Sequence, residues 1–334
     1  MRASPSAPSD SPDPPVPTAP AAPAASREPS LPYMVLCGLA MGAADVVPGV
    51  SGGSMAFILG IYGQLLEAIA GFDLGLLALL ALLRRGDWSA AAARVHLGFL
   101  VPLLAGLAAS VLLLVRPITW LYEFQPVLLF AFFFGLIIGA ILLIARHAHW
   151  GWQGLVAMAA GVALALLLVT RVPVTMPHDP FTLFWSGAVA IMAMILPGIS
   201  GSFLLLVLGQ YQHVMEGVKG LDPAVLIPFA LGCAVGLISF VRLLRWLLHH
   251  FHGQVVALLV GFMAGSLWKI WPFRTVLEST HNAKGKLIVL RDALAAPPST
   301  AALMVAALLA ALGVALVVGI EQLQRRAGVE EMGG

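Results

Sequence analysis

The hydrophobic pattern alternates long apolar stretches with short polar connections. A helix that crosses about 30 Å of hydrocarbon at about 1.5 Å per residue needs about 20 apolar residues. Six stretches approach or exceed that length: residues 96–115, 126–145, 152–170, 224–246, 254–272 and 300–320. Each is predicted to form a full transmembrane helix.

Two other apolar stretches are interrupted in the middle. Residues 33–69 are broken by "PGVSGG" and residues 182–218 by "PGISGS". The part before each break is only about 15 residues, or about 22 Å as a helix, which is too short to cross. Each stretch is therefore predicted to form a re-entrant helical hairpin. Its turn is assigned to a proline, which ends a helix, and a glycine, which allows close backbone approach: Pro48 with Gly49, and Pro197 with Gly198.

The two interrupted stretches are copies of each other. Aligning Pro48 with Pro197 also pairs rarer residues: Gly38 with Gly187, Ser51 with Ser200, Gly52 with Gly201, Gly60 with Gly209, Tyr62 with Tyr211 and Glu67 with Glu216. Further along, a second alignment continues the match: Pro102 with Pro228, Gly106 with Gly232, Arg116 with Arg242, Trp120 with Trp246, Gly135 with Gly261 and Gly139 with Gly265. Chance agreement would pair alanines and leucines, so the pattern indicates an internal duplication.

The number of spans between the copies sets their orientation. Three predicted spans separate the two hairpins, so the second copy enters the membrane from the opposite side. The expected fold is an all-α integral membrane protein with inverted repeats, an arrangement typical of transporters with a site near the bilayer midplane. The predicted divisions are a tail (1–30), repeat 1 (31–150), a linking span (151–180), repeat 2 (181–272), a loop (273–299) and a C-terminal span with its tail (300–334).

Composition agrees with this assignment. Of the 334 residues, 60% are hydrophobic and 10% charged, too few polar groups to cover a water-soluble globule. The net charge is +2 and the cations are scattered, so the bilayer is the expected partner and nucleic acid is not. The Pro/Ala-rich tail is expected to be disordered and lacks the pattern of a cleavable signal peptide. Lys and Arg in the shorter connections favour a cytoplasmic N-terminus.

The broken hairpins suggest an anion site. A helix N-terminus presents free N–H groups and a positive dipole end, which favour phosphate or carboxylate. Inverted symmetry would bring two such ends together, with hydroxyl groups beside them. The candidate phosphate-binding residues are Ser51, Gly52, Gly53, Ser54, Ser200, Gly201 and Ser202. The alternative is that these residues only make tight turns that pack two half-helices.

Three acidic residues are candidates for coupling or gating. Asp45 has no acidic counterpart, because Met194 stands at the matched position. A carboxylate in so apolar a segment should be paired, protonatable or bound to a cation; alternatively, Asp45 braces the turn by accepting backbone hydrogen bonds. Glu67 and Glu216 lie near the hairpin ends, where a solvated role at the interface is the stronger reading.

Arg116 and Arg242 are the candidates for phosphate recognition outside the hairpins. The guanidinium fork suits phosphate oxygens, and the duplication would place one arginine on each side of the membrane. Snorkelling beside Trp120 and Trp246 is the equal alternative. The histidines have no spacing typical of a metal site, and no metal or cofactor is expected. Self-association into a homo-oligomer is left open.

The hairpin sequences resemble a known family. "GAADVVPGVSGGSMAFILGIYGQLL" and "ILPGISGSFLLLVLGQY" closely resemble the bacterial polyprenyl-phosphate transporter family, also called domain of unknown function 368, over roughly residues 33–320. The resemblance implies a flippase that moves undecaprenyl phosphate from the outer to the inner leaflet of the bacterial cytoplasmic membrane, where this lipid carrier is recycled for cell-wall synthesis. The family's motifs fall on Asp45, on Pro48 to Ser54 and on Pro197 to Ser202.

Two other functions compete with this reading. "PGxSGS" also resembles the "PGxSRS" segment of membrane undecaprenyl-pyrophosphate phosphatases, but Gly52 and Gly201 stand where those enzymes carry arginine. Their paired-glutamate ExxxE motif is missing from the apolar segments, so the chain is predicted not to be an enzyme. A carrier for small anions would use the same midplane site.

Overall fold

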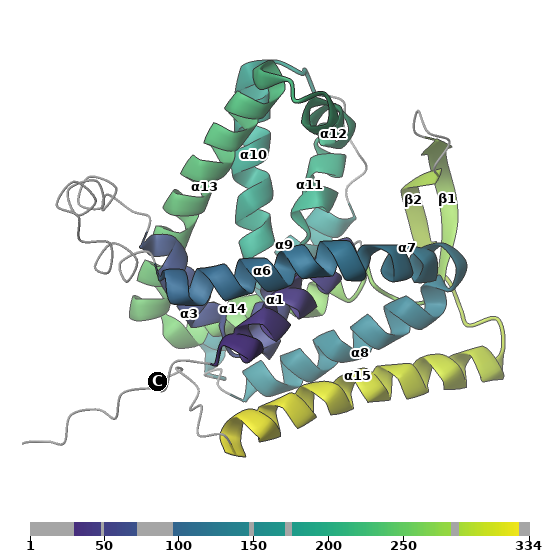
Figure 1. The fold of residues 1–334 in the computed structure, drawn as a ribbon. Coiled ribbons are helices and arrows are strands. Elements are labelled where there is room, and N and C mark those ends of the chain that lie inside the picture. Colours follow the sequence, from purple (N-terminus) through teal and green to yellow (C-terminus); the bar gives the residue numbers. More distant parts are fainter. Residues whose placement is uncertain are drawn as a thin grey trace, which may run out of the picture.

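A computed structural model describes residues 30–47, 50–71, 96–146, 150–170, 176–281 and 287–326. The predictions for Pro48, Gly49 and the tail before Ser30 concern residues outside this set. The described residues are mostly helical, as predicted (Figure 1).

The helices follow the predicted order. The first half of the chain contains α1 (Leu31–Val46), α2 (Gly52–Ile58), α3 (Tyr62–Ala70), α6 (Leu97–Leu113), α7 (Val115–Phe124), α8 (Pro126–Ala145) and α9 (Trp152–Val169). The second half contains α10 (Pro180–Ile195), α11 (Gly201–Val207), α12 (Tyr211–Gly220), α13 (Pro223–His250), α14 (His252–Ser266) and α15 (Thr300–Arg326).

Fewer helices have the length of a span than the sequence pattern predicted. Among the described residues, four helices are long and apolar enough to cross a bilayer: α8, α9, α13 and α15. The pair α6 and α7 adds a fifth if it forms one span, although it is bent by 51°. The predicted span over 254–272 corresponds to α14, which has only 15 residues and ends at Ser266. The chain is thus a multi-pass membrane protein.

Proline explains the bend between α6 and α7. Pro117 has no N–H to donate to the carbonyl of Leu113, and its ring clashes with that carbonyl. The helix accordingly breaks at Leu114. Leu243 stands at the matched position of the second copy, and α13 runs unbroken for 28 residues.

A β-hairpin lies where a loop was predicted. Strands β1 (Arg274–His281) and β2 (Leu287–Leu294) pair antiparallel and project beside α7 (Figure 1). The sequences "RTVLESTH" and "LIVLRDAL" contain β-branched residues, which favour strands. Within the part of the chain that the structure describes, this hairpin departs from the all-helical prediction.

Both interrupted segments contain three short helices. Serines begin the second helix of each: Ser51 caps α2 through its side chain, and Ser200 precedes α11. A second break follows at matched glycines, Gly60 with φ 67° and Gly209 with φ 68°. Because glycine adopts positive φ without steric cost, both copies turn at the same point.

The second segment folds back as a hairpin. Helices α10 and α13 pack side by side in the same direction, since Phe184 contacts Gly232 and Ala188 contacts Gly236 one turn later. Their first turns share a buried cluster with α12. The chain therefore returns through α11 and α12 to the end at which α10 began (Figure 1), as the sequence predicted.

Matched glycines pack against matched partners in the two copies. A methyl group at Gly38 would collide with the carbonyl of Leu103, and one at Gly187 with the carbonyl of Phe229. Leu103 and Phe229 are themselves aligned, because each follows a matched proline. The duplication read from the sequence thus extends to backbone contacts between α1 and α6 and between α10 and α13.

The remaining helices pair in the same way. Gly313 of α15 packs on α8, and Gly161 of α9 packs on α14. The residues that they meet occupy aligned positions: Phe132 and Leu136 in α8, Leu258 and Phe262 in α14. Close approach at small residues is the usual means of helix packing in membranes. Each of these pairs therefore joins a helix of one half of the chain to a helix of the other.

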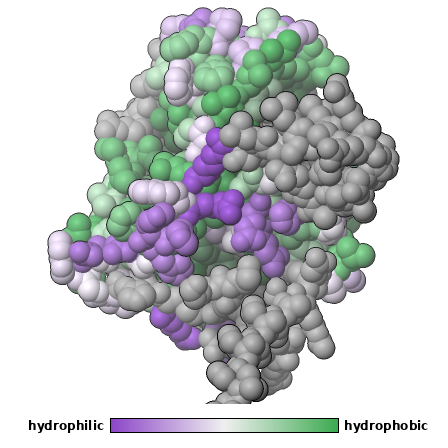
Figure 2. Space-filling view, turned by 90° about the vertical axis from the view of Figure 1, so that its left-hand side faces the viewer, coloured by the Kyte–Doolittle hydropathy of each residue, from purple (hydrophilic) through white to green (hydrophobic). Residues whose placement is uncertain are grey.

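The outer surface suits a lipid environment. Large hydrophobic side chains are exposed along α13 and α15, including Leu231, Val235, Leu308, Leu312 and Leu316. On the face shown in Figure 2, hydrophobic residues cover much of the upper part and hydrophilic residues gather across the middle. Exposed apolar patches of this kind mark a surface that contacts membrane or protein.

The glycine contacts generate a stability prediction. Gly232→Ala should lower the free energy of unfolding by about 1 to 3 kcal/mol, because the new methyl group collides with the carbonyl of Phe184 and overpacking has that cost. Gly319→Ala is the matched control, since no atom lies within 4 Å of the added methyl group and alanine favours a helix. Thermal unfolding in detergent measures both; equal melting temperatures would contradict the packing.

Candidate functional site

The two hairpin tips are in direct contact. Ser51 Oγ donates to the carbonyl of Met194 at 3.2 Å, and the Tyr62 hydroxyl donates to the carbonyl of Ile195 at 3.2 Å. In the opposite sense, the backbone N–H of Gly198 donates to Ser54 Oγ at 2.8 Å. The two carbonyls belong to the last turn of α10, where no helical N–H is available. The first hairpin therefore completes the hydrogen bonding of the second.

Glycines permit this contact. A Cβ at Gly53 would lie 2.8 Å from the carbonyl oxygen of Ile195, which is too close for any other residue. Gly198 has φ 94°, and a Cβ there would lie 2.9 Å from Ser266 Oγ. The predicted turn residue Gly198 thus needs both its backbone freedom and its missing side chain.

The polar groups of the first tip bond to one another. Asp45 Oδ1 accepts the N–H of Gly52 at 2.6 Å, and Ser51 Oγ accepts the N–H of Gly53 at 3.1 Å. Ser51 and Ser54 are both fully buried. The Asp45 carboxylate therefore lies where the sequence placed an external anion, and it braces the turn, which was the alternative interpretation of this residue.

The second tip differs. Met194 replaces the acid, and Ser200 Oγ bonds to Ser202 Oγ at 2.8 Å rather than capping α11. Ser202 is exposed. Among the described residues, neither Ser200 nor Tyr211 returns to α1 the hydrogen bonds that Ser51 and Tyr62 give to α10. The duplicated sequences thus form an asymmetric pair of tips: the serines of the first are buried, and one serine of the second, Ser202, is exposed.

Lys269, which the sequence did not mark as a site residue, lies beside the second tip. Lys269 Nζ is 5.1 Å from the centroid of the Phe203 ring, a cation–π contact. The Lys269 side chain is half-buried, and Arg274 Nη1 donates to its carbonyl at 3.3 Å. The signal in the sequence was a lysine between two tryptophans, "WKIW", at the end of a predicted span.

The other charged candidates lie on exposed helix surfaces. Arg116 is exposed at the start of α7, just after the bend, and Arg242 is exposed within the straight helix α13. Glu67 on α3 and Glu216 on α12 are also exposed. Exposure agrees with a solvated role for the glutamates. For the arginines it is compatible with phosphate recognition and with snorkelling at the interface.

One buried acid was missed. Glu321 of α15 is 5% exposed, and its carboxylate lies 3.8 Å from the Arg146 guanidinium at the end of α8. Acidic side chains within membrane helices usually pair with such a partner. In the sequence Glu321 is simply an acid near the end of an apolar stretch. Its partner Arg146 could be found only once the pairing of α15 with α8 was known.

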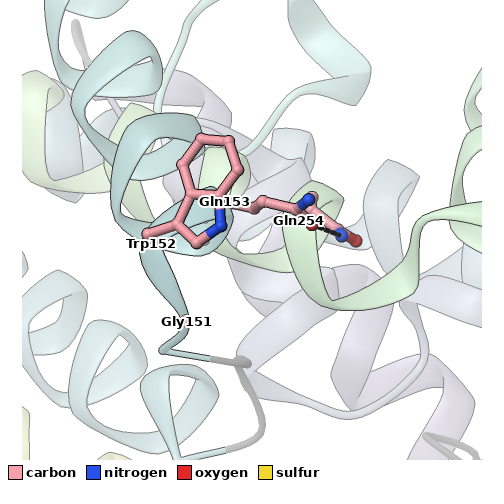
Figure 3. Close-up of a pocket in the computed structure, with 5 residues that line it drawn as sticks. Gly151, Trp152, Gln153 and Gln254 are labelled. Atoms are coloured by element: carbon pink, nitrogen blue, oxygen red, sulfur yellow. Dashed lines mark hydrogen bonds between the residues drawn. The ribbon is translucent and has the colours of Figure 1, made fainter.

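A separate hollow of about 290 Å³ lies where α9 and α14 begin. Gly151, Trp152, Gln153, Gly154 and Gln254 line it, and Gln254 Nε2 donates to Gln153 Oε1 at 3.1 Å (Figure 3). It contains no charged side chain. The hollow therefore offers less to a phosphate than the hairpin tips do.

The tip contacts generate a prediction with an internal control. Tyr62→Phe removes the donor to Ile195 and should lower the free energy of unfolding by about 1 kcal/mol, with a larger loss if the carbonyl stays buried and unpaired. Tyr211→Phe alters the matched tyrosine, whose hydroxyl has no partner among the described residues, and should leave stability unchanged. Thermal unfolding of the purified variants measures the difference; equal effects would mean that the tip contact contributes nothing.

Comparisons with known proteins agree with the predicted resemblance. The model of an undecaprenyl phosphate translocase-like (VCA0040-like) family matches residues 41–288. A polyprenyl-phosphate transporter of Vibrio cholerae is 38% identical over 302 residues, covering 86% of this chain and 95% of the relative. One of Staphylococcus aureus is 32% identical over 260 residues, covering 71% and 85%. No solved structure matches. The chain belongs to the undecaprenyl phosphate translocase-like family.

Proposed function

We propose that this protein moves undecaprenyl phosphate from the outer to the inner leaflet of the bacterial cytoplasmic membrane. The relatives named polyprenyl-phosphate transporter support the substrate class. The observation that carries the proposal is the contact between two duplicated hairpin tips, made by Ser51, Ser54 and Tyr62 inside an apolar fold. Irregular backbone at such a position is tolerated only against protein or a wet cavity.

Helix directions support an inverted repeat. Helices α9 and α14 run parallel, because Gln153 meets Gln254 near their starts and Ala165 meets Gly265 near their ends. Helix α9 follows α8 after a short connection and is expected to run back across the membrane. Helix α14, the counterpart of α8, would then run opposite to α8. In this arrangement each hairpin enters from its own side, and the lysines and arginines of the shorter connections favour a cytoplasmic N-terminus.

Transport requires that the first tip opens. The Asp45 carboxylate holds the N–H of Gly52, and a lipid phosphate would compete for the same donor. We infer that Asp45 changes protonation when a headgroup arrives and so releases Gly52, which lets Ser51, Gly52, Gly53 and Ser54 contact the phosphate. Asp45 then returns as the headgroup leaves, while the prenyl tail stays in lipid.

The arginines would collect the headgroup at the two interfaces. Arg116 follows the bend of α7, and Arg242 is exposed on α13 beside Leu243 and Trp246, which are also exposed. A guanidinium at the interface attracts phosphate strongly, because it is permanently charged and can donate two hydrogen bonds at once. In the inverted arrangement the two residues serve opposite leaflets. Glu67 and Glu216 remain at the aqueous ends of the hairpins.

The proposal is for a transporter without catalysis. Hydrolysis of a pyrophosphate needs cations that clamp it and carboxylates that handle a metal or a proton. Gly52 and Gly201 supply neither at the motif positions. A small-anion carrier would use the same tips, and it is separated from a lipid transporter by whether inorganic phosphate itself crosses the membrane.

Asp45 provides the first test. In liposomes loaded with labelled undecaprenyl phosphate, Asp45→Asn should slow leaflet exchange about tenfold, because the amide keeps an acceptor for Gly52 but cannot change its charge. Asp222→Asn is the control, since Asp222 also accepts a backbone N–H, that of Ala224, but at the exposed start of α13 where asparagine caps equally well. Unchanged exchange with Asp45→Asn would remove its gating role.

The arginines provide a second test. Arg116→Ala and Arg242→Ala should each slow exchange several-fold, and each should act mainly on lipid supplied from one leaflet. Replacement by lysine should restore part of the rate, because the charge is kept and the fork is lost. If both alanine variants exchange lipid at the normal rate from either leaflet, the arginines only anchor their helices at the interface.

A further inference from the structure

A buried hydroxyl group on α6 has no hydrogen-bond partner in the part of the chain that the structure describes. Ser110 is fully buried, and its Oγ atom neither donates nor accepts a hydrogen bond there. Leaving a buried polar group unpaired costs free energy. Most such groups in native proteins are paired, and an exception calls for a physical reason. Ser110 therefore holds an unused donor and acceptor inside the fold.

This hydroxyl group lies against a glycine of α1. A Cβ at Gly42 would be 2.5 Å from Ser110 Oγ, so the serine occupies space that only a missing side chain leaves. Helices α1 and α6 run in the same direction, because Gly38 contacts Leu103 and Gly42 contacts Ser110 further along both helices. Ser110 therefore lies beside the last turns of α1, close to the first hairpin tip.

Asp45 follows Gly42 on the same face of α1. Residues three apart on a helix have Cβ positions about 5 to 6 Å apart, so Asp45 and Ser110 both border the position of Gly42. Side chains on a helix lean toward its N-terminus, which for Asp45 is the direction of Gly42. In this structure the Asp45 carboxylate accepts the N–H of Gly52. Once it releases Gly52, the side chain can rotate toward the Ser110 hydroxyl.

The acid, the hydroxyl group and the glycine between them are replaced together in the second copy. No matched position carries a hydroxyl or carboxyl group: Gly42 aligns with Ile191, Asp45 with Met194 and Ser110 with Gly236. Ordinary helix packing is kept in both copies, as at Gly38 and Gly187. The joint replacement therefore sets these three residues apart from the duplicated frame and ties Ser110 to Asp45.

We propose that Ser110 is the second partner of Asp45: its hydroxyl group pairs with the carboxyl group that has released Gly52. This inference rests on the proposed function and assigns Ser110 a positioning role in the gating step. A hydroxyl group both donates and accepts hydrogen bonds, so it can pair with the carboxyl group in either protonation state. Without Ser110, the released carboxyl group would lose a partner in apolar surroundings, which is costly. Ser110 thus lowers the free energy of the opened first tip.

Ser110→Ala tests this role through two measurements that should move in different directions. Exchange of labelled undecaprenyl phosphate between liposome leaflets should slow about fivefold, the effect of losing about one hydrogen bond in the opened state. The melting temperature of the same purified protein should stay equal or rise, because the hydroxyl group has no partner among the described residues. Ser239→Ala, at an exposed position of α13, is the control and should change neither.

A double variant tests whether Ser110 acts through Asp45. Independent effects of about tenfold for Asp45→Asn and about fivefold for Ser110→Ala would multiply to about fiftyfold. An asparagine that stays at Gly52 never reaches Ser110, so the second substitution should then have little effect. Exchange by the double variant should therefore remain within about twofold of Asp45→Asn alone.

The outcomes separate this inference from the proposed function. If Asp45→Asn is slow but Ser110→Ala exchanges lipid at the normal rate, only the role of Ser110 is wrong. A multiplied loss in the double variant, or a lower melting temperature in Ser110→Ala, would also overturn that role in favour of simple packing. If the wild type does not exchange undecaprenyl phosphate, the proposed function fails, and the gating step of Ser110 fails with it.

Discussion

The hydrogen bonds between the two hairpin tips are the interaction on which this structure depends. Each hairpin interrupts a helix in an apolar environment, and each interruption leaves backbone groups that water cannot reach. Ser51 and Tyr62 satisfy carbonyls at the end of α10, and Ser54 satisfies the N–H of Gly198. The second tip is incomplete without the first, so the contact that stabilises its break also places both sets of phosphate-binding candidates at one point in the fold.

Glycine packing builds the frame that holds the tips in register. Matched glycines bring α6 onto α1 and α13 onto α10, and others bring α9 onto α14 and α15 onto α8. The last two pairs join opposite halves of the chain, so the two halves pack on each other through backbone contacts. The helices of this frame pack in matched pairs, but the tips differ. Asp45 accepts a backbone N–H at the first tip, whereas Ser202 is exposed at the second. The frame is thus duplicated, whereas the two tips differ in their polar contacts.

The sequence predicted the frame better than the site. Hairpins, duplication and glycine faces follow from spacing alone, and they are visible in the contacts of Gly38, Gly187 and Gly313. The bend at Pro117 and the strands of residues 274–294 were not predicted, although the missing N–H of Pro117 and the β-branched residues of the strands would have indicated them. The hydrogen bond between Asp45 and Gly52 could not be predicted, because two groups seven residues apart meet only through the exact path of the turn. Lys269 escaped notice because its neighbour Phe203 lies on a helix distant in the chain.

The most direct measurement of the central claim is photolabelling with a prenyl phosphate that carries a diazirine on its first isoprene unit, followed by mass spectrometry of the labelled peptides. The account predicts labels on the two tip segments, residues 50–58 and 196–207, and their loss when unlabelled farnesyl phosphate is added. Labels confined to the hollow at the start of α9 and α14, or spread evenly over the outer helices, would contradict a headgroup site at the hairpin tips.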